Sequence, residues 1–172
     1  PQDKLTKIAG AAYAPNAKSP RFTRFVSEVM SGEADKARFM QKSLGYGLTG
    51  DTRYECMFFY YGATTRNGKG TLMESALHVM GDYGLTVRPE TIAAKPSANS
   101  QNPTEDIARL AGVRFANISE LRRGLVLNEA QIKSMTGNDT LNARFLHENS
   151  FDFKPQFKLY VNTNYLPAIT DM

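Results

Sequence analysis

The segment that decides the fold spans residues 54–80 and reads YECMFFYYGATTRNGKGTLMESALHVM. Residues 54–61 are mostly apolar and aromatic, which is the pattern of a strand buried on both faces. A polar loop with glycines follows at 62–68, and apolar residues then recur at helical spacing from Lys69 to Met80. The segment therefore predicts a strand, a glycine-bearing loop and a helix in direct succession.

This loop has the parts that phosphate binding requires. Glycines let backbone N–H groups approach an anion closely, and the N-terminus of a helix favours negative charge. Lys69 can reach the terminal phosphates of a nucleotide, and Thr71 offers a hydroxyl to Mg²⁺. The predicted nucleotide-binding residues are Gly62, Thr65, Arg66, Asn67, Gly68, Lys69, Gly70, Thr71 and Leu72.

The loop departs from the usual phosphate-binding pattern in two ways. Five residues separate Gly62 from Gly68, where the pattern has four, and Gly70 stands between the lysine and the hydroxyl. The alternative interpretation is a glycine-rich turn with a surface lysine. The flanking strand and helix favour phosphate binding, because they occur in the order that the motif requires.

Apolar periodicity on both sides of this segment predicts alternating strands and helices. We expect an irregular lead-in at 1–20, helices at 21–31, 33–44, 105–111 and 128–135, strands at 113–118 and 157–161, a polar loop at 95–104 and a hairpin at 143–153. Thr104 is the expected cap of its helix. This alternation predicts an α/β fold with a mostly parallel central sheet and helices on both faces. We divide the chain into a helical lead-in at 1–50 and a core at 51–172.

Composition limits the class of protein. The 172 residues are 41% apolar and 22% charged, as in a typical globular domain. No apolar run reaches the roughly 20 residues of a membrane span, so we expect no membrane partner. The single cysteine, Cys56, excludes an internal disulfide and fits a reducing cytoplasm, and the two histidines lack metal-ligand spacing. The net charge of +4 mildly favours a polyanionic partner.

Five motifs in order make the chain resemble the superfamily 3 helicase domain of phage and plasmid primases, a branch of the AAA+ ATPases. They are Asn67–Thr71, the Gly81–Tyr83 turn, the strand that ends at Ser119-Glu120, the stretch 132–144, and Thr-Asn-x-x-Pro at 163–167. The resemblance covers nearly the whole chain. It implies an AAA+-like P-loop NTPase sandwich in the cytoplasm of a bacterial host, with ATP and Mg²⁺ as cofactors.

The resemblance also implies roles for single residues. Glu120 would be the general base that activates the water attacking the γ-phosphate, and it would hold the metal together with Thr71. Ser119 stands where many relatives have a metal-binding aspartate. Asn164 would be the polar sensor of the γ-phosphate, with Asn162 as a weaker candidate. Lys69, Glu120 and Asn164 are therefore the expected catalytic residues.

The segment 133–154 should contain the hairpin that relatives direct at DNA in a central channel. The expected DNA contacts are Lys133, Arg144, His147 and Lys154, with His147 at the tip. Phe145, Phe151 and Phe153 lie between these basic groups, and aromatic rings can stack on bases. The alternative is a hairpin that simply buries one apolar face.

The first hypothesis is thus an ATP-driven translocase on single-stranded or forked DNA that works as a ring, most simply a hexamer. Relatives place an arginine finger shortly after the Thr-Asn-x-x-Pro motif, beyond Met172. We therefore expect residues 1–172 to hydrolyse ATP slowly alone. Two alternatives stay open: a P-loop nucleotide kinase, and a non-catalytic DNA-binding or assembly module.

Overall fold

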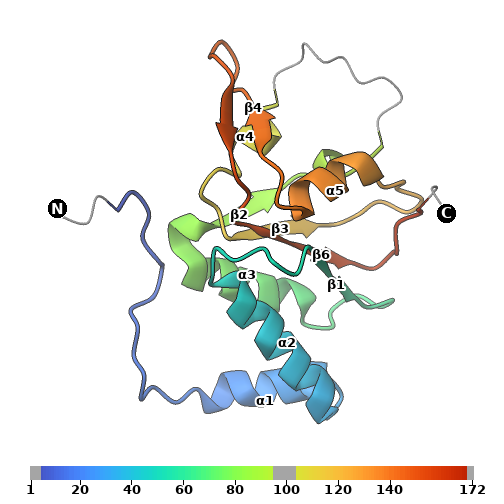
Figure 1. Ribbon diagram of the computed structural model, residues 1–172. Coiled ribbons are helices and arrows are strands. Elements are labelled where there is room, and N and C mark those ends of the chain that lie inside the picture. Colours follow the sequence, from blue (N-terminus) through green and yellow to red (C-terminus); the bar gives the residue numbers. More distant parts are fainter. Residues whose placement is uncertain (1–4, 95–103, 170–172) are drawn as a thin grey trace.

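The computed structural model describes residues 5–94 and 104–169. Its centre is a four-stranded parallel sheet with the strand order β1-β6-β3-β2 (Figure 1). The elements are α1 Pro20–Val29, α2 Ala34–Gly47, β1 Met57–Tyr61, α3 Lys69–Met80, a 3-10 turn Gly81–Tyr83, β2 Gly84–Val87, a 3-10 turn Pro89–Thr91, α4 Glu105–Ala108, β3 Phe115–Ser119, α5 Glu129–Thr136, β4 Leu141–Ala143, β5 Phe151–Phe153 and β6 Lys158–Thr163.

Both faces of the sheet are covered, which gives three layers (Figure 1). Helices α1, α2 and α3 lie on one face, where the rings of Phe115 and Tyr160 stack at 3.9 Å between centroids. Helix α5 and the β4–β5 hairpin lie on the other face, over Ala116, Ile118 and Val161. Because alternate residues of a strand point to opposite faces, β3 and β6 are apolar on both. The predicted α/β fold with a parallel sheet is confirmed.

Strand β1 is an edge strand of this sheet, so the prediction that it is buried on both faces was wrong. Among the described residues it pairs only with β6, and it leaves Phe59 40% and Tyr61 52% exposed. Apolar composition shows that a strand can be buried. Whether it has a neighbouring strand on each side depends on the strand order of the fold. The two central strands, β3 and β6, have the burial that their composition predicts.

The helices predicted around the phosphate loop are present. The third helix runs from Lys69 to Met80 as expected, and α1, α2 and α5 match their predicted ranges within a few residues. No helix in the described part of the chain is long and apolar enough to cross a membrane. Strand β2 is absent from the prediction, because the glycines at 81 and 84 indicate only a turn that ends α3.

The segment around α4 differs from the prediction. Thr104 occupies the position before the helix, but its side chain makes no capping hydrogen bond. Its hydroxyl instead accepts a hydrogen bond from the backbone N–H of Arg144 at 2.9 Å, which ties this helix to the β4–β5 hairpin. The predicted polar loop at 95–104 lies outside the described residues except for Thr104.

The N-terminal lead-in is irregular, as predicted, but it is anchored to the far end of α3 (Figure 1). The N–H of Asp82 donates to the carbonyl of Ile8 at 3.0 Å, and the N–H of Gly10 donates to that of Val79 at 3.0 Å. The chain then runs past the 91% exposed Tyr13 to α1. The lead-in thus runs from the C-terminal end of α3 to α1, and α1 packs near the N-terminal end of α3.

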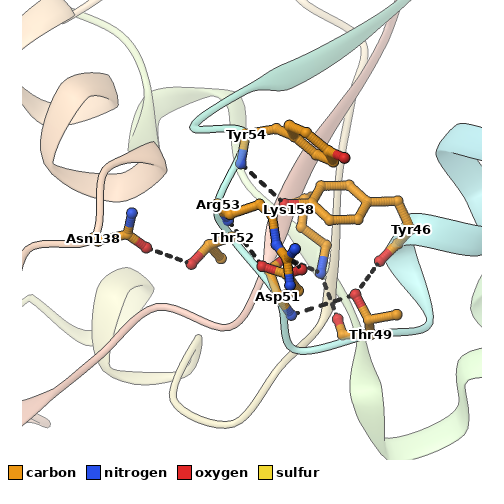
Figure 2. A network of polar contacts seen from close by, with 8 residues as sticks. All are labelled: Tyr46, Thr49, Asp51, Thr52, Arg53, Tyr54, Asn138 and Lys158. Carbon is orange, nitrogen blue, oxygen red and sulfur yellow. Dashed lines mark hydrogen bonds and ion pairs between the residues drawn. The ribbon is translucent and has the colours of Figure 1, made fainter.

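Lys158 fastens the connection between α2 and β1 to the sheet (Figure 2). It is the first residue of β6, is 2% exposed, and donates to the carbonyls of Thr49, Asp51 and Gln156. Its ammonium also lies 4.7 Å from the ring centroid of Tyr46. Burial lowers the pKa of Lys158 to about 8, while the Asp51 carboxylate raises it. One buried cation therefore holds the connection between α2 and β1 at the amino edge of the sheet.

Candidate nucleotide-binding site

A polar cavity of about 620 Å³ lies at the carboxyl edge of the sheet, where β1, β3 and β6 end. In open parallel sheets, ligands bind at this edge because the strands end there and their loops diverge. The cavity brings together Thr65, Arg66, Asn67, Gly68, Lys69, Gly70, Thr71, Glu74, Glu120, Leu121, Asn162, Thr163, Asn164 and Tyr165. The three expected catalytic residues, Lys69, Glu120 and Asn164, therefore line one cavity.

The loop between β1 and α3 has the backbone that a phosphate loop needs. Gly68 has a φ of +84°, which a residue with a side chain rarely adopts, and α3 begins directly after it. A Cβ on Gly68 would lie 2.6 Å from Cγ1 of Val29 and 3.1 Å from the Phe25 ring, so α1 packs against the loop. The first residues of α3 line the polar cavity, and the N-terminus of a helix favours an anion.

Lys69 turns back onto its own loop. Its ammonium donates to the carbonyl of Gly62 at 3.1 Å, to that of Thr64 at 3.4 Å and to Oδ1 of Asn67 at 2.9 Å. The Asn67 amide in turn donates to the Thr64 carbonyl at 2.8 Å. Burial lowers the pKa of Lys69 from its ordinary value. Three oxygen atoms of the loop thus accept hydrogen bonds from the Lys69 ammonium. The oxygens of a bound phosphate could accept the same hydrogen bonds in their place.

Glu120 stands at the end of β3 in an unusual conformation. Its φ is +62°, and its N–H donates to the carbonyl of Asn162 at 3.3 Å, which extends the β3–β6 pairing by one residue. The side chain is exposed and lines the cavity. A non-glycine residue with positive φ is strained, and such strain is commonest at functional sites. This geometry sends the carboxylate into the cavity and away from the sheet.

Ser119 does not line the cavity. Its Oγ accepts hydrogen bonds from the amides of Asn117 and Asn162, each at 2.9 Å. A hydroxyl oxygen has two acceptor positions, so both are taken and none is left for a cation. Ser119 therefore has a structural role in joining β3 and β6.

The residues that line the cavity fit Mg²⁺ through hard oxygen donors. Thr71, Glu74 and Glu120 supply a hydroxyl and two carboxylates, which are the donor types that this ion prefers. Glu74 is absent from the sequence-based list of site residues. It lies three residues after Thr71 on α3, and this spacing places both on one face of the helix, so the signal was present in the sequence.

The Thr-Asn-x-x-Pro segment contributes the far wall of the cavity. Asn162, Thr163, Asn164 and Tyr165 all line it, and the Thr163 hydroxyl accepts from the N–H of Tyr165 at 3.0 Å. The Thr163 carbonyl accepts from the N–H of Gly62 at 3.2 Å, which joins this turn to the phosphate loop. The Asn162 amide donates to Oγ of Ser119 at 2.9 Å, so this side chain is engaged in joining β6 to β3. Asn164 is therefore the better placed of the two sensor candidates.

The expected DNA-contacting residues fall into two places. Arg144, His147 and Lys154 lie on the β4–β5 hairpin, and exposed His147 is at the loop between the strands with a φ of +63°. Lys133 lies on α5 and lines a different, apolar hollow beside β1. The structure therefore groups three of the four residues and separates Lys133.

The aromatic residues of the hairpin contact one another. The Phe145 and Phe151 rings stack at 6.0 Å between centroids, and Phe151 and Phe153 lie 5.8 Å apart. All three are half-buried, and Phe153 packs against the core. This arrangement agrees with the alternative in which the hairpin buries an apolar face. Leu146, 55% exposed, is the apolar side chain that the loop presents outward.

Two expected nucleotide-binding residues, Gly62 and Leu72, line a neighbouring cavity instead of the polar one. Asn67, Gly68 and Lys69 line both. The phosphate loop therefore forms a partition between two hollows of different chemistry.

The parallel sheet, the loop-to-helix junction and the acidic strand end define a protein with a P-loop NTPase-like fold. Residues 60–172 match the family of unknown function DUF5906, and the chain belongs to that family. The match includes β1 from Tyr60 onward, the phosphate loop and every residue that lines the polar cavity.

Two curated viral proteins are similar in sequence. "Putative helicase 022R" of Frog virus 3 (isolate Goorha) is 34% identical over 152 residues, which cover 86% of this chain and 15% of the relative. "Putative helicase L207/L206" of Acanthamoeba polyphaga mimivirus is 31% identical over 118 residues, which cover 69% of this chain and 12% of the relative. The chain thus spans less than a sixth of the length of either relative.

Solved structures of the NrS-1 C-terminal region have the same fold. One apo structure superposes with a TM-score of 0.66 at 12% identity and covers 94% of this chain and 38% of that one. A second, described as the A form, gives a TM-score of 0.68 over 96% of this chain and 37% of the other. At this identity the likeness concerns the fold alone.

Proposed function

We propose that this chain is the ATP-hydrolysing core of a DNA helicase or translocase of the superfamily 3 type. The observation that carries the proposal is the polar cavity in which Lys69, Thr71, Glu120 and Asn164 meet at the carboxyl edge of the sheet. The two viral relatives, each named as a putative helicase, support the same class.

Each side chain has a defined task in this proposal. Lys69 leaves the oxygens of its own loop for those of the β- and γ-phosphates, an exchange of like partners that costs little. Glu120 takes the proton of the attacking water, and the Asn164 amide orients that water or the γ-phosphate. Thr71, Glu120 and Glu74 would hold Mg²⁺, which neutralises charge on the phosphates when bound.

Nucleotide binding by the wild type and by Lys69→Ala tests this role. We expect the variant to bind ATP at least about tenfold more weakly, because it loses charge-assisted hydrogen bonds to phosphate. Titration calorimetry in the presence of Mg²⁺ measures the effect, and Lys18→Ala, an exposed lysine of the lead-in, is the matched control. Equal affinity in wild type and Lys69→Ala would contradict the ATPase role. Phosphoryl transfer to a nucleoside monophosphate would show a kinase instead.

The DNA-contacting part of the proposal concerns the β4–β5 hairpin. His147 and Lys154 are exposed there, and cations of this kind neutralise phosphates and release counterions. We expect Lys154→Ala to weaken binding of single-stranded DNA several-fold and to reduce the slope of log K against log salt by about 0.7. Fluorescence anisotropy at several salt concentrations measures both quantities.

Lys36→Ala is the control for this experiment, because Lys36 is paired with Glu33 at 2.6 Å on a different helix. An unchanged salt slope in Lys154→Ala would remove the hairpin from the DNA-binding surface. Assembly into a ring, most simply a hexamer, is part of the same proposal, and sedimentation of the chain with ATP and DNA tests it.

A further inference from the structure

A second cavity, of about 680 Å³, lies on the other side of the phosphate loop. It is bounded by the end of α1, the first half of α2 and residues Phe58 to Tyr61 of β1. Asn67, Gly68 and Lys69 line this cavity and also the polar one. The two cavities therefore meet at the loop that would hold the phosphates.

The second cavity is lined mainly by apolar residues, with Glu33, Asp35 and Lys36 also in its lining, whereas the first cavity is mainly polar. The residues that line the second cavity include Phe39, Met40, Phe58, Phe59 and Tyr61. Carboxylates, amides, hydroxyls and a lysine dominate the polar cavity. Flat aromatic ligands favour apolar walls that contain rings, because stacking and burial both stabilise them.

A nucleoside triphosphate joins a polyanion to a flat aromatic base, so it needs two adjoining subsites of these two kinds. We propose that the cavity between α1, α2 and β1 binds the nucleobase of the nucleotide whose phosphates occupy the polar cavity. This inference rests on the proposed function, and it adds the helices α1 and α2 to the nucleotide site.

Phe39 and Tyr61 are the side chains best placed to contact the base. Phe39 is 65% exposed and Tyr61 is 52% exposed, although each has a large and mainly apolar side chain. The rings of Phe39 and Phe58 meet in an edge-to-face arrangement with 6.3 Å between their centroids, and Phe39 stays 65% exposed. Burial of these two rings against a base would explain why aromatic residues stand open at this point of an edge strand and its neighbouring helix.

Packing connects this subsite to the phosphate loop. Val29, at the end of α1, lines the cavity and also lies where a Cβ of Gly68 would be. Leu72, the first buried residue of α3, forms part of the floor. Movement of α1 and α2 would therefore alter the base subsite and the loop together.

Comparison of ATP with inorganic tripolyphosphate separates the base from the phosphates. We expect Phe39→Ala to bind ATP about tenfold more weakly, in the range found when a ring that stacks on a base is removed. Its affinity for tripolyphosphate should stay within about twofold of the wild-type value, because tripolyphosphate has no base to stack. Tyr61→Ala should behave likewise, and Phe39→Tyr should restore ATP binding. Titration calorimetry with Mg²⁺ measures all of these affinities.

Tyr13→Ala is the control, because Tyr13 is 91% exposed and lines neither cavity. Circular dichroism checks that every variant is folded. Unchanged ATP affinity in both Phe39→Ala and Tyr61→Ala would overturn the inference, as would an equal loss of ATP and tripolyphosphate. If these variants altered only self-association, the cavity would be an interface between copies and the inference would again be wrong.

The outcome for Lys69→Ala distinguishes failure of this inference from failure of the proposed function. Loss of both ligands in Lys69→Ala, together with wild-type ATP affinity in Phe39→Ala, would retain the phosphate site and reject the base subsite. Wild-type affinity for both ligands in Lys69→Ala would reject the nucleotide site as a whole.

Discussion

Lys69 and Lys158 occupy opposite edges of the same parallel sheet and have similar partners. Each donates to three oxygen atoms, and burial lowers the pKa of each. Lys158 is 2% exposed at the start of β6, whereas Lys69 lines two cavities at the start of α3. The same residue type is enclosed by the chain at the amino edge and open to a ligand at the carboxyl edge.

The difference follows from where loops go in a parallel sheet. At the amino edge the chain between α2 and β1 closes over Lys158, and the carbonyls of Thr49 and Asp51 are fixed as its partners. At the carboxyl edge the strands end and their loops separate, so the acceptors of Lys69 belong to one short loop. Charge and loss of solvent do not distinguish the two lysines; access to a cavity does.

Replacement of each lysine by methionine should show the difference between the two lysines most clearly. Lys158→Met should lower the free energy of unfolding by about 3 kcal/mol, because buried carbonyls lose their donor. Lys69→Met should change it by less than about 1 kcal/mol, because its acceptors can reach solvent. Urea denaturation measures both values. A loss of similar size in the two variants would show that both lysines are structural.

Gly68→Ala sharpens the view that the carboxyl edge depends on α1. The new Cβ would meet Val29 at 2.6 Å, and the φ of +84° would strain an alanine, so we expect a loss of about 2 kcal/mol in stability. Gly70→Ala is the matched control, because its Cβ would meet nothing within 4 Å inside α3. This control should gain about 0.5–1 kcal/mol from helix propensity. Thermal denaturation of both variants tests the pair, and a gain in Gly68→Ala would contradict the packing.

The pH dependence of stability gives the smallest effect and concerns the amino edge. The pKa of Lys158 falls from 10.5 to about 8 on folding, so the unfolded chain binds more protons between these values. The resulting stability is fully present above pH 10.5 and is lost as the pH falls through 8. From pH 8 to 9.5, wild type should therefore gain about 1.5 kcal/mol relative to Lys158→Met. Denaturation of both proteins at each pH measures the difference, and parallel curves would contradict it.

Several site residues could be predicted from the sequence because their signals are local. The loop and helix from Gly62 to Met80 follow from glycines, a lysine and apolar spacing, and the structure has α3 at the predicted bounds. Glu120 and Asn164 end apolar strands, and parallel strands bring such ends to one edge. Glu74 was missed, although its position three residues after Thr71 on the predicted helix was a signal in the sequence.

Other features depend on partners that are distant in the chain. The edge position of β1, the role of Ser119 between two asparagines and the enclosure of Lys158 each require β6 to lie between β1 and β3. Nothing in the local composition of these segments specifies that order. The separation of Lys133 from the β4–β5 hairpin also depends on tertiary packing, because α5 lies beside β1.

The sequence by itself determined the α/β class, the glycine-bearing loop before α3 and the polar residues that follow the buried strands. These depend on periodicity and on residue chemistry, which act over a few neighbouring positions. Only the tertiary structure decided which ends share a cavity, and that α1 and α2 form a second, aromatic cavity beside the loop. Strand order and helix packing decide these features, because they join residues that are far apart in the chain.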